Sequence, residues 1–252
     1  MTIIAVYNIK GGVGKTAAAV NLSFLAAGEE KKILLCDLDP QGSASYYFRI
    51  KPKVKSGFRV LVKGGDRLLA AVKATDYPYL DLLPADFSFR NLDLVLEQVK
   101  HSKKRLRRSL NTLAEDYDLI FLDCPPNITL VSENIFQAAD YLLVPVIPTT
   151  LSQRTFDKLL VFLARRNFPA DRVLAFFSMV EYRKSMHQNT LETMADKYDC
   201  LLKRQIPFLS LVEKMGFYRE PVPARYPQSK AGQAYIHLWK EIRRRLVRNK
   251  NW

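Results

Sequence analysis

Residues 10–16 read KGGVGKT, and this stretch decides the fold class of the chain. An apolar run, 3–7 (IIAVY), comes directly before it, and an Ala/Val/Leu-rich stretch, 17–27, comes directly after it. The pattern predicts a strand, a tight loop and a helix. Glycine permits the left-handed backbone that such a loop needs, and the first N–H groups of the helix attract an anion. We therefore interpret the segment as a loop that cradles phosphate groups.

The loop departs at its first position from the usual phosphate-loop pattern, GxxxxGK[ST]. Ile9 stands where that pattern has glycine, and Lys10 adds a second cation next to Lys15. We expect Lys15 to reach the β- and γ-phosphates and the Thr16 hydroxyl to ligate Mg²⁺. Within its own loop Lys10 would crowd Lys15. We therefore interpret Lys10 as a charge donor to a phosphate that a second subunit holds.

Apolar runs alternate with amphipathic stretches along the whole chain. The predicted strands are 3–7, 32–37, 80–84, 118–123, 141–147 and 173–180, and the predicted helices are 17–27, 87–113, 152–166, 187–197 and 228–248. Strands that are apolar on both faces indicate a parallel sheet covered by helices on both sides. We predict an α/β fold with a doubly wound, mostly parallel sheet, as one domain over residues 1–252. Residues 43–73 are typical of a loop with short helices.

Acidic residues close two of the predicted strands. Asp37 and Asp39 flank the end of one strand, and Asp123, followed by two prolines, ends another. The carboxyl ends of parallel strands form the ligand crevice, so these carboxylates should face the phosphate loop. One of the first two can hydrogen-bond the Mg²⁺ shell or Thr16, and the other can orient an attacking water. Asp123 matches the Walker-B arrangement near Mg²⁺, and the prolines suit a switch that depends on the γ-phosphate.

The net charge of +14 favours an anionic partner, first nucleic acid and then an anionic membrane surface. Three scattered cysteines (Cys36, Cys124 and Cys200) exclude a disulfide framework and a zinc site. The chain starts directly with a predicted strand and has no apolar run near the ~20 residues of a membrane span. We therefore expect a cytoplasmic protein.

The motifs KGGVGKT, DLDPQG (37–42) and DCPP (123–126) together resemble the ParA/Soj/MinD family of deviant-Walker ATPases. The nearest match is the ParA/Soj branch, and the resemblance extends over nearly the whole chain. It implies Mg²⁺-dependent ATP hydrolysis with slow intrinsic turnover, and Lys10, Lys15 and Asp39 as catalytic residues. It implies metal binding by Thr16 and, through water, by Asp123. The implied nucleotide-binding residues are Lys10, Gly11, Gly12, Val13, Gly14, Lys15, Thr16, Ala17 and, against the adenine ring, Pro207.

The resemblance also implies a cycle of assembly. ATP would bring two subunits into a homodimer, which binds double-stranded DNA without sequence preference, and a ParB-like or adaptor protein would stimulate hydrolysis. The chain would then be nucleoid-associated and would position or partition a cargo such as a plasmid, a chromosome or a protein organelle. The first candidates for DNA contacts are Arg183 and Lys184, followed by Lys203 and Arg204.

Four positions depart from the family pattern. Ala17 replaces a second Thr or Ser after the Mg²⁺ threonine, and Ser178 replaces a common Asn near the base. Phe208-Leu209 replaces the Arg-Asn that commonly follows the Ile-Pro pair, which removes a basic residue from a region that contributes to DNA or partner contacts.

Other functions remain open at this point. A MinD-like ATPase that cycles on membranes, for division-site, flagellar or polysaccharide-export placement, would use the basic amphipathic stretch 231–246 as its anchor. Ordinary packing of that helix on the sheet is the competing interpretation, and charge density favours DNA as the partner. A non-hydrolysing nucleotide-binding scaffold is disfavoured by Lys10 and Asp39. An iron–sulfur carrier is disfavoured because no cysteine pair is available to bridge subunits.

Overall fold

The structure is a computed structural model that describes residues 1–55, 57, 59–97 and 104–248. Its centre is a seven-stranded sheet with the order β3-β4-β2-β5-β1-β6-β7. The strands are β1 Thr2–Val6, β2 Ile33–Asp37, β3 Lys73–Ala74, β4 Leu80–Leu83, β5 Leu119–Asp123, β6 Tyr141–Val146 and β7 Val173–Phe177. All neighbouring strands pair in parallel except β3 and β4, which are antiparallel. The predicted fold class is confirmed.

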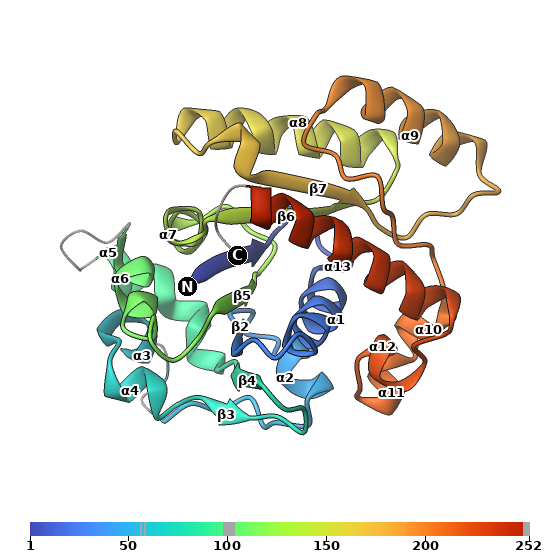
Figure 1. Cartoon of the computed structure of the whole chain (residues 1–252). Coiled ribbons are helices and arrows are strands. Elements are labelled where there is room, and N and C mark those ends of the chain that lie inside the picture. Colours follow the sequence, from blue (N-terminus) through green and yellow to red (C-terminus); the bar gives the residue numbers. More distant parts are fainter. Residues whose placement is uncertain (56, 58, 98–103, 249–252) are drawn as a thin grey trace.

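Helices pack against both faces of this sheet (Figure 1). They are α1 Lys15–Ala27, α2 Ser43–Tyr47, α3 Arg59–Lys63, α4 Asp66–Leu69, α5 Leu92–Glu97, α6 Arg105–Asn111, α7 Leu130–Ala138, α8 Thr150–Arg165, α9 Ser185–Lys197, α10 Ser210–Glu213, α11 Met215–Tyr218, α12 Val222–Arg225 and α13 Lys230–Arg248. Two 3₁₀ helices, η1 Phe87–Asn91 and η3 Ala170–Arg172, complete the described elements.

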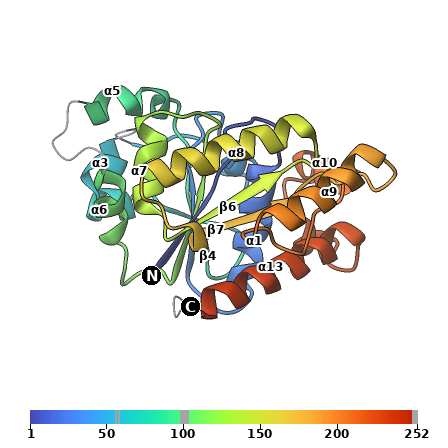
Figure 2. The ribbon, with the colours of Figure 1, turned by 90° about the horizontal axis from the view of Figure 1, so that it is seen from above.

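The alternation of side chains along β1 shows how the two layers arise. Ile3 and Ala5 pack into the core on the side of α7 and α8, whereas Ile4 and Val6 pack into the core on the side of α1 and α13. All four are fully buried, as expected for a central parallel strand covered on both faces. Viewed from above, α8 lies on one side of β6 and β7, and α13 lies on the other (Figure 2).

The helix predicted over residues 87–113 is wrong as a single element. Asp86 caps η1 by accepting a hydrogen bond from the Ser88 N–H, and α5 follows. A separate helix, α6, begins at Arg105, where the Asn134 side chain accepts the N–H groups of Arg105 and Leu106 at 3.2 and 3.3 Å. Residues 98–103 of the predicted helix lie outside the described part.

Several short elements were not predicted, among them α10, α11 and α12, and neither were α7 and β3; one strand is shorter than expected. The pattern did not predict α7, although Thr129 and Ser132 form a capping box at its start. It did not predict the two-residue strand β3 either. The strand predicted over 173–180 ends at Phe177, and Met179 then adopts a left-handed backbone with φ of +56°. Such a residue redirects the chain.

The last helix packs as part of the core. Six of its apolar side chains are buried against the α1 side of the sheet: Ala231, Tyr235, Leu238, Trp239, Ile242 and Leu246. Glu29, which follows α1, accepts hydrogen bonds from Trp239 Nε1 at 2.9 Å and Arg243 at 3.0 Å. The apolar face of α13 is therefore covered by the protein itself. None of the described helices combines the length and the apolar composition of a membrane-crossing segment.

Candidate nucleotide-binding site

The phosphate loop connects β1 to α1 at the carboxyl edge of the sheet, next to β5 and β6. Gly12 and Gly14 have φ of +70° and +89°, in the left-handed region that favours glycine. A Cβ atom on Gly14 would lie 2.9 Å from the Ser178 Oγ. Glycine at position 14 is therefore favoured by the left-handed backbone, and a side chain there would also have to displace the Ser178 hydroxyl.

The two lysines of the loop use different partners. Lys15, only 7% exposed, donates from Nζ to the carbonyl oxygen of Lys10 at 3.1 Å. Burial lowers the pKa of Lys15, and the nearby Asp123 opposes that shift. The Lys10 Nζ instead donates to the Ser152 Oγ, near the start of α8, at 3.3 Å. The crowding expected between the two side chains is relieved because they point to different partners.

A buried asparagine that was not predicted holds the entrance to the loop. The Asn8 side chain donates to the carbonyl oxygen of Pro145 at 2.7 Å and accepts the N–H of Lys10 at 2.9 Å. It thereby joins the ends of β1 and β6 to the first residue of the motif. The only signal in the sequence is a polar residue at the end of an apolar run. Ser152, the partner of Lys10, gives no local signal at all.

Two acidic side chains meet at the ends of β2 and β5, where Asp37 and Asp123 are in register. Both are fully buried. Ser45 of α2 donates its N–H and its hydroxyl to the Asp37 Oδ2, each at 2.7 Å. Among the described residues, the Asp37 Oδ1 and both Asp123 carboxylate oxygens have no hydrogen-bond partner of normal geometry. Buried polar atoms without partners mark a place where a ligand or water is expected.

Burial dominates the protonation of this pair. It raises the pKa of Asp37 to about 6, against the hydrogen bonds from Ser45, which lower it. It raises the pKa of Asp123 well above its usual range, and the adjacent Thr16 hydroxyl and the Lys15 ammonium lower it. A cation bound beside these carboxylates would favour their ionised forms.

The donor set fits a hydrated Mg²⁺ ion. No three His, Cys, Asp or Glu side chains in the described ranges are grouped so as to ligate a metal directly. Mg²⁺ keeps several waters and usually takes only one or two protein ligands beside the phosphates. The Thr16 hydroxyl close to Asp123 would supply one direct ligand, and the unpartnered Asp123 oxygens would accept hydrogen bonds from bound water. The metal-binding roles expected for Thr16 and Asp123 stay a prediction.

Asp39 lies in a tight turn just beyond β2. Its Oδ1 accepts the N–H of Gln41 at 3.0 Å, and its carbonyl oxygen accepts the N–H of Gly42 at 2.9 Å. Its charge opposes the lowering of the Lys15 pKa and contributes to the raised pKa of Asp123. The structure therefore brings Asp39 into the same electrostatic site as the loop lysine and the buried carboxylate.

The proline segment after β5 borders the phosphate loop. A Cβ on Gly11 would lie 4.0 Å from the Pro126 side chain. The Tyr7 hydroxyl donates to the carbonyl oxygen of Asn127 at 2.7 Å, which holds the segment beside β1. Cys124 is fully buried, and burial raises the pKa of its thiol. This cysteine is therefore a packing residue rather than a reactive one.

The remaining predicted site residues lie toward the β7 edge of the sheet. Pro207 bridges in parallel to Val180, which follows Met179 and Ser178 at the phosphate loop. Lys203 and Arg204 are exposed, and their N–H groups donate to Glu241 of α13. Figure 1 shows this edge beside α9 and α13.

Arg183 and Lys184 are also exposed and lie between β7 and α9. The Lys184 ammonium forms an ion pair with Glu181, whereas no ion pair involves Arg183 within the described ranges. These four cations thus share one edge of the molecule but do not enter the nucleotide site. Their proposed role in DNA contacts stays a prediction.

Comparison with known proteins identifies relatives along the whole chain. The family model of the AAA domain matches residues 1–168. The sporulation initiation inhibitor protein Soj of Bacillus subtilis is 30% identical over 247 residues, which cover 95% of this chain and 97% of that protein. The chromosome partitioning protein ParA of Caulobacter vibrioides is 26% identical over 254 residues, which cover 96% and 94%.

Solved structures share the fold. A cobyrinic acid a,c-diamide synthase from Mycobacterium smegmatis with bound ADP and magnesium has a TM-score of 0.81 at 26% identity, covering 98% of this chain and 96% of that one. A putative plasmid partition protein from Borrelia burgdorferi bound to AMPPNP has a TM-score of 0.80 at 22% identity, covering 98% and 99%. Both contain an adenine nucleotide and the first also contains magnesium, which agrees with the cofactors expected here.

Proposed function

Because the chain belongs to the ParA/MinD family of P-loop ATPases, we propose that it is a ParA-type ATPase with a DNA-bound dimeric state. In this proposal ATP joins two copies into a homodimer that binds double-stranded DNA without sequence preference. A ParB-like or adaptor protein then stimulates hydrolysis and releases the dimer. The cycle positions a cargo such as a plasmid, a chromosome or a protein organelle on the nucleoid.

The observation that carries this proposal is the divergence of the two loop lysines. Lys15 is buried in its own loop, where its ammonium is within reach of a bound phosphate. Lys10 turns away to Ser152 of α8, outside that cradle. A second cation that does not serve its own nucleotide supports a role toward the phosphates of a facing subunit, as an arginine finger acts in trans.

Phosphoryl transfer depends mainly on positioning and on charge stabilisation. In the proposed dimer Lys15 and the facing Lys10 offset the charge that develops on the γ-phosphate. Mg²⁺ held by Thr16, with Asp123 acting through water, supplies further positive charge beside the phosphates. Asp39 orients the attacking water. Because the site is complete only with a second copy, turnover is slow until a partner stabilises the closed dimer.

The packing of α13 favours DNA over a membrane as the surface on which the ATPase cycles. A membrane anchor of the kind expected from a basic amphipathic helix needs a free apolar face. The apolar face of α13 is buried on the sheet, and its Trp239 and Arg243 are held by Glu29. Nonspecific DNA binding, in contrast, needs only exposed cations, and the net charge of +14 supplies them.

Binding to a random-sequence DNA duplex with ADP, ATP and a slowly hydrolysed ATP analogue tests the proposal. Wild-type protein should bind only with the triphosphates, and binding should weaken steeply with salt. Lys10→Ala should still bind ATP as a monomer but lose dimerisation and DNA binding, whereas Asp39→Ala should keep both and lose hydrolysis by about 100-fold or more. Lys158→Ala, which removes an exposed cation of α8, serves as the control.

The opposite results would overturn the proposal. DNA binding that is absent in every nucleotide state would move the assignment to the membrane-cycling ATPase, which binding to anionic vesicles would then support. DNA binding that persists in Lys10→Ala with the same nucleotide dependence would show that Lys10 does not act between subunits.

A further inference from the structure

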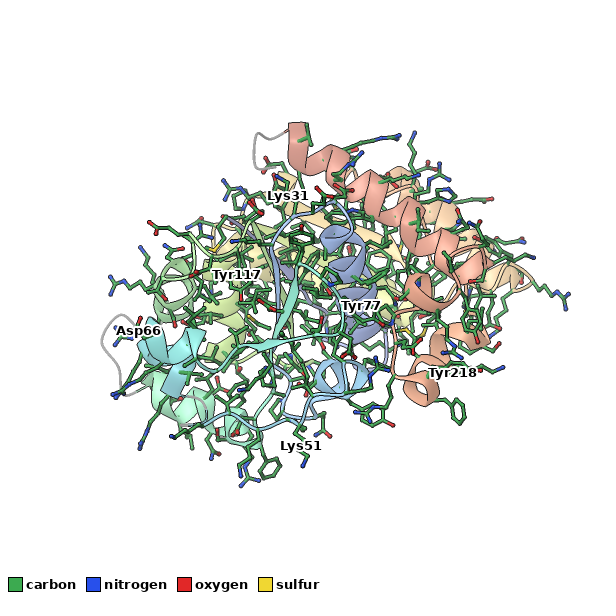
Figure 3. All side chains as sticks on the ribbon, turned by 60° about the horizontal axis from the view of Figure 1, so that its bottom comes forward. Lys31, Lys51, Asp66, Tyr77, Tyr117 and Tyr218 are labelled. Atoms are coloured by element: carbon green, nitrogen blue, oxygen red, sulfur yellow. The ribbon has the colours of Figure 1, made fainter. Side chains whose placement is uncertain are left out.

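Residues 49–73 carry an excess of positive charge that no run of cations reveals in the sequence. The segment has eight Lys or Arg residues and one acidic residue, Asp66, so its net charge of +7 is half of the +14 of the whole chain. The segment follows α2 and contains α3, α4 and β3. It lies at the edge of the sheet opposite β7. Figure 3 shows Lys51 and Asp66 of this segment at the periphery of the molecule.

Four of these cations line one cleft. Lys53 and Lys55 come from the extended stretch before α3, Arg67 comes from α4, and Lys73 comes from β3. The cleft has a volume of about 700 Å³, and its remaining lining residues are small and apolar. Among the described residues, no acidic side chain lines it. Cations gathered on two walls of a cleft without a carboxylate between them create a strong local attraction for anions.

Three of the four cleft cations have no partner of opposite charge in the described part of the protein. Within the described ranges, Lys55, Arg67 and Lys73 form no ion pair. Arg49, at the start of the segment, differs: its guanidinium is paired with Asp76 at 2.6 Å and with Glu220 at 3.5 Å. Against burial, which raises it, the pKa of the neighbouring Asp86 is lowered by hydrogen bonds from Ser88 and Val54, and the Lys53 ammonium adds to that lowering. Three exposed cations therefore remain available to an external ligand.

One wall of the cleft is attached to the turn that holds Asp39. A Cβ on Gly42 would lie 2.9 Å from the Pro52 Cβ, so this proline packs directly on the turn. Two residues further on, the Val54 N–H donates to the Asp86 Oδ2 at 2.8 Å. These contacts fix the stretch that presents Lys53 and Lys55, so the cleft is a built feature rather than a collection of loose side chains.

We propose that this cationic cleft, formed by Lys53, Lys55, Arg67 and Lys73, binds the phosphate groups of the DNA backbone. This inference rests on the proposed function, because it names a surface with which the dimer holds DNA, in addition to the contacts predicted at the β7 edge. The cleft suits phosphodiesters because backbone contacts need cations but no base-reading element. It suits a membrane less well, since the apolar residues that line it in the described part of the chain, Val54, Ala70 and Ala71, are too small to insert.

The test compares two triple variants in the ATP-bound state. Lys55→Ala with Arg67→Ala and Lys73→Ala removes the unpaired cations of the cleft and leaves Lys53 beside Asp86. The control, Lys158→Ala with Arg172→Ala and Lys240→Ala, removes the same charge from exposed positions on α8, η3 and α13. The cleft variant should lower the salt slope of DNA binding by about 3 and weaken binding at least tenfold at moderate salt. The control should leave the slope nearly unchanged.

ATP binding by both variants verifies that they are folded, since none of the six residues lies at the nucleotide. If the cleft variant binds DNA as the control does, the cleft proposal is overturned while the DNA-binding function stands. If the wild-type protein binds no DNA in any nucleotide state, both proposals fail. If the cleft variant loses binding to vesicles of anionic lipid but keeps binding to DNA, the cleft is a membrane site and the proposal is overturned.

Discussion

The phosphate loop and the cationic cleft both attract anions, but they concentrate positive charge in different ways. In the loop, one lysine, Lys15, is 7% exposed and held by a main-chain oxygen, and glycine backbone surrounds it. In the cleft, several cations are exposed, and three of them have no ion pair among the described residues. A compact ligand is bound by a few groups in fixed positions, whereas a long polyanion is bound by the number of charges.

This difference predicts how each region responds to substitution. Removing one buried charged group from a fixed site costs much binding free energy, because its partners stay buried without a counter-charge. Removing one exposed cation from a surface costs little binding free energy, and the losses of affinity add up when several cations are removed.

The largest effect is expected at the phosphate loop. Lys15→Ala should weaken ATP binding by about 100-fold, because the phosphates then lose the buried cation that is expected to reach them and face uncompensated buried carboxylates. Arg67→Ala, a single change in the cleft, should leave ATP binding unchanged and lower the salt slope of DNA binding by about 1. Isothermal titration with Mg²⁺ and ATP measures the first effect. ATP binding by Lys15→Ala within about threefold of wild type would contradict the contrast between the regions.

A medium effect is expected where the two regions meet. Gly42→Ala places a Cβ 2.9 Å from the Pro52 Cβ at a φ of +67°, so it combines a left-handed backbone with a clash. It should lower the free energy of unfolding by about 2–3 kcal/mol. Gly12→Ala is the matched control, with a φ of +70° but no atom within 4 Å of its Cβ. Its expected cost is about 1 kcal/mol. If urea unfolding gives the same loss of unfolding free energy for Gly42→Ala and Gly12→Ala, the contact with Pro52 does not add to the cost of the substitution.

The smallest effect concerns the buried carboxylates of the nucleotide site. The folded state holds the pKa of Asp37 at about 6, above its ordinary 3.8, so the folded state binds more protons between these values. Stability of the nucleotide-free protein should therefore fall as pH rises from 5 to 7, by about 1 kcal/mol from this group. Asp37→Asn should remove that part of the fall. Urea unfolding of both proteins in EDTA measures it, and parallel pH profiles would refute the assignment.

Local patterns predicted the parts of the site that lie at strand ends. The KGGVGKT loop, Asp37 and Asp123 all follow apolar runs, and parallel pairing of β2 with β5 brings the two carboxylates into register. Asp39 was expected beside these two carboxylates for the same reason, because it follows the end of β2. These positions were predictable because a doubly wound sheet gathers the carboxyl ends of its strands.

Contacts between distant segments were not predictable in this way. The partner of Lys10, Ser152, is 142 positions away along the chain. Asn134 of α7 accepts the N–H groups of Arg105 and Leu106 at the start of α6, a contact that no local period reveals. The sequence does not predict the cationic cleft, because its residues are spread over 21 positions and only the fold brings them together.

The hydrogen bond between the Lys15 ammonium and the Lys10 carbonyl has a consequence for exchange between subunits. Without nucleotide, the Lys15 ammonium holds the main chain of Lys10, the residue that would act on the phosphates of the other copy. In the proposed dimer, a phosphate that binds one copy would compete for its Lys15 ammonium and release the Lys10 main chain of that copy. A copy without nucleotide would then be a poor donor of Lys10 to its partner.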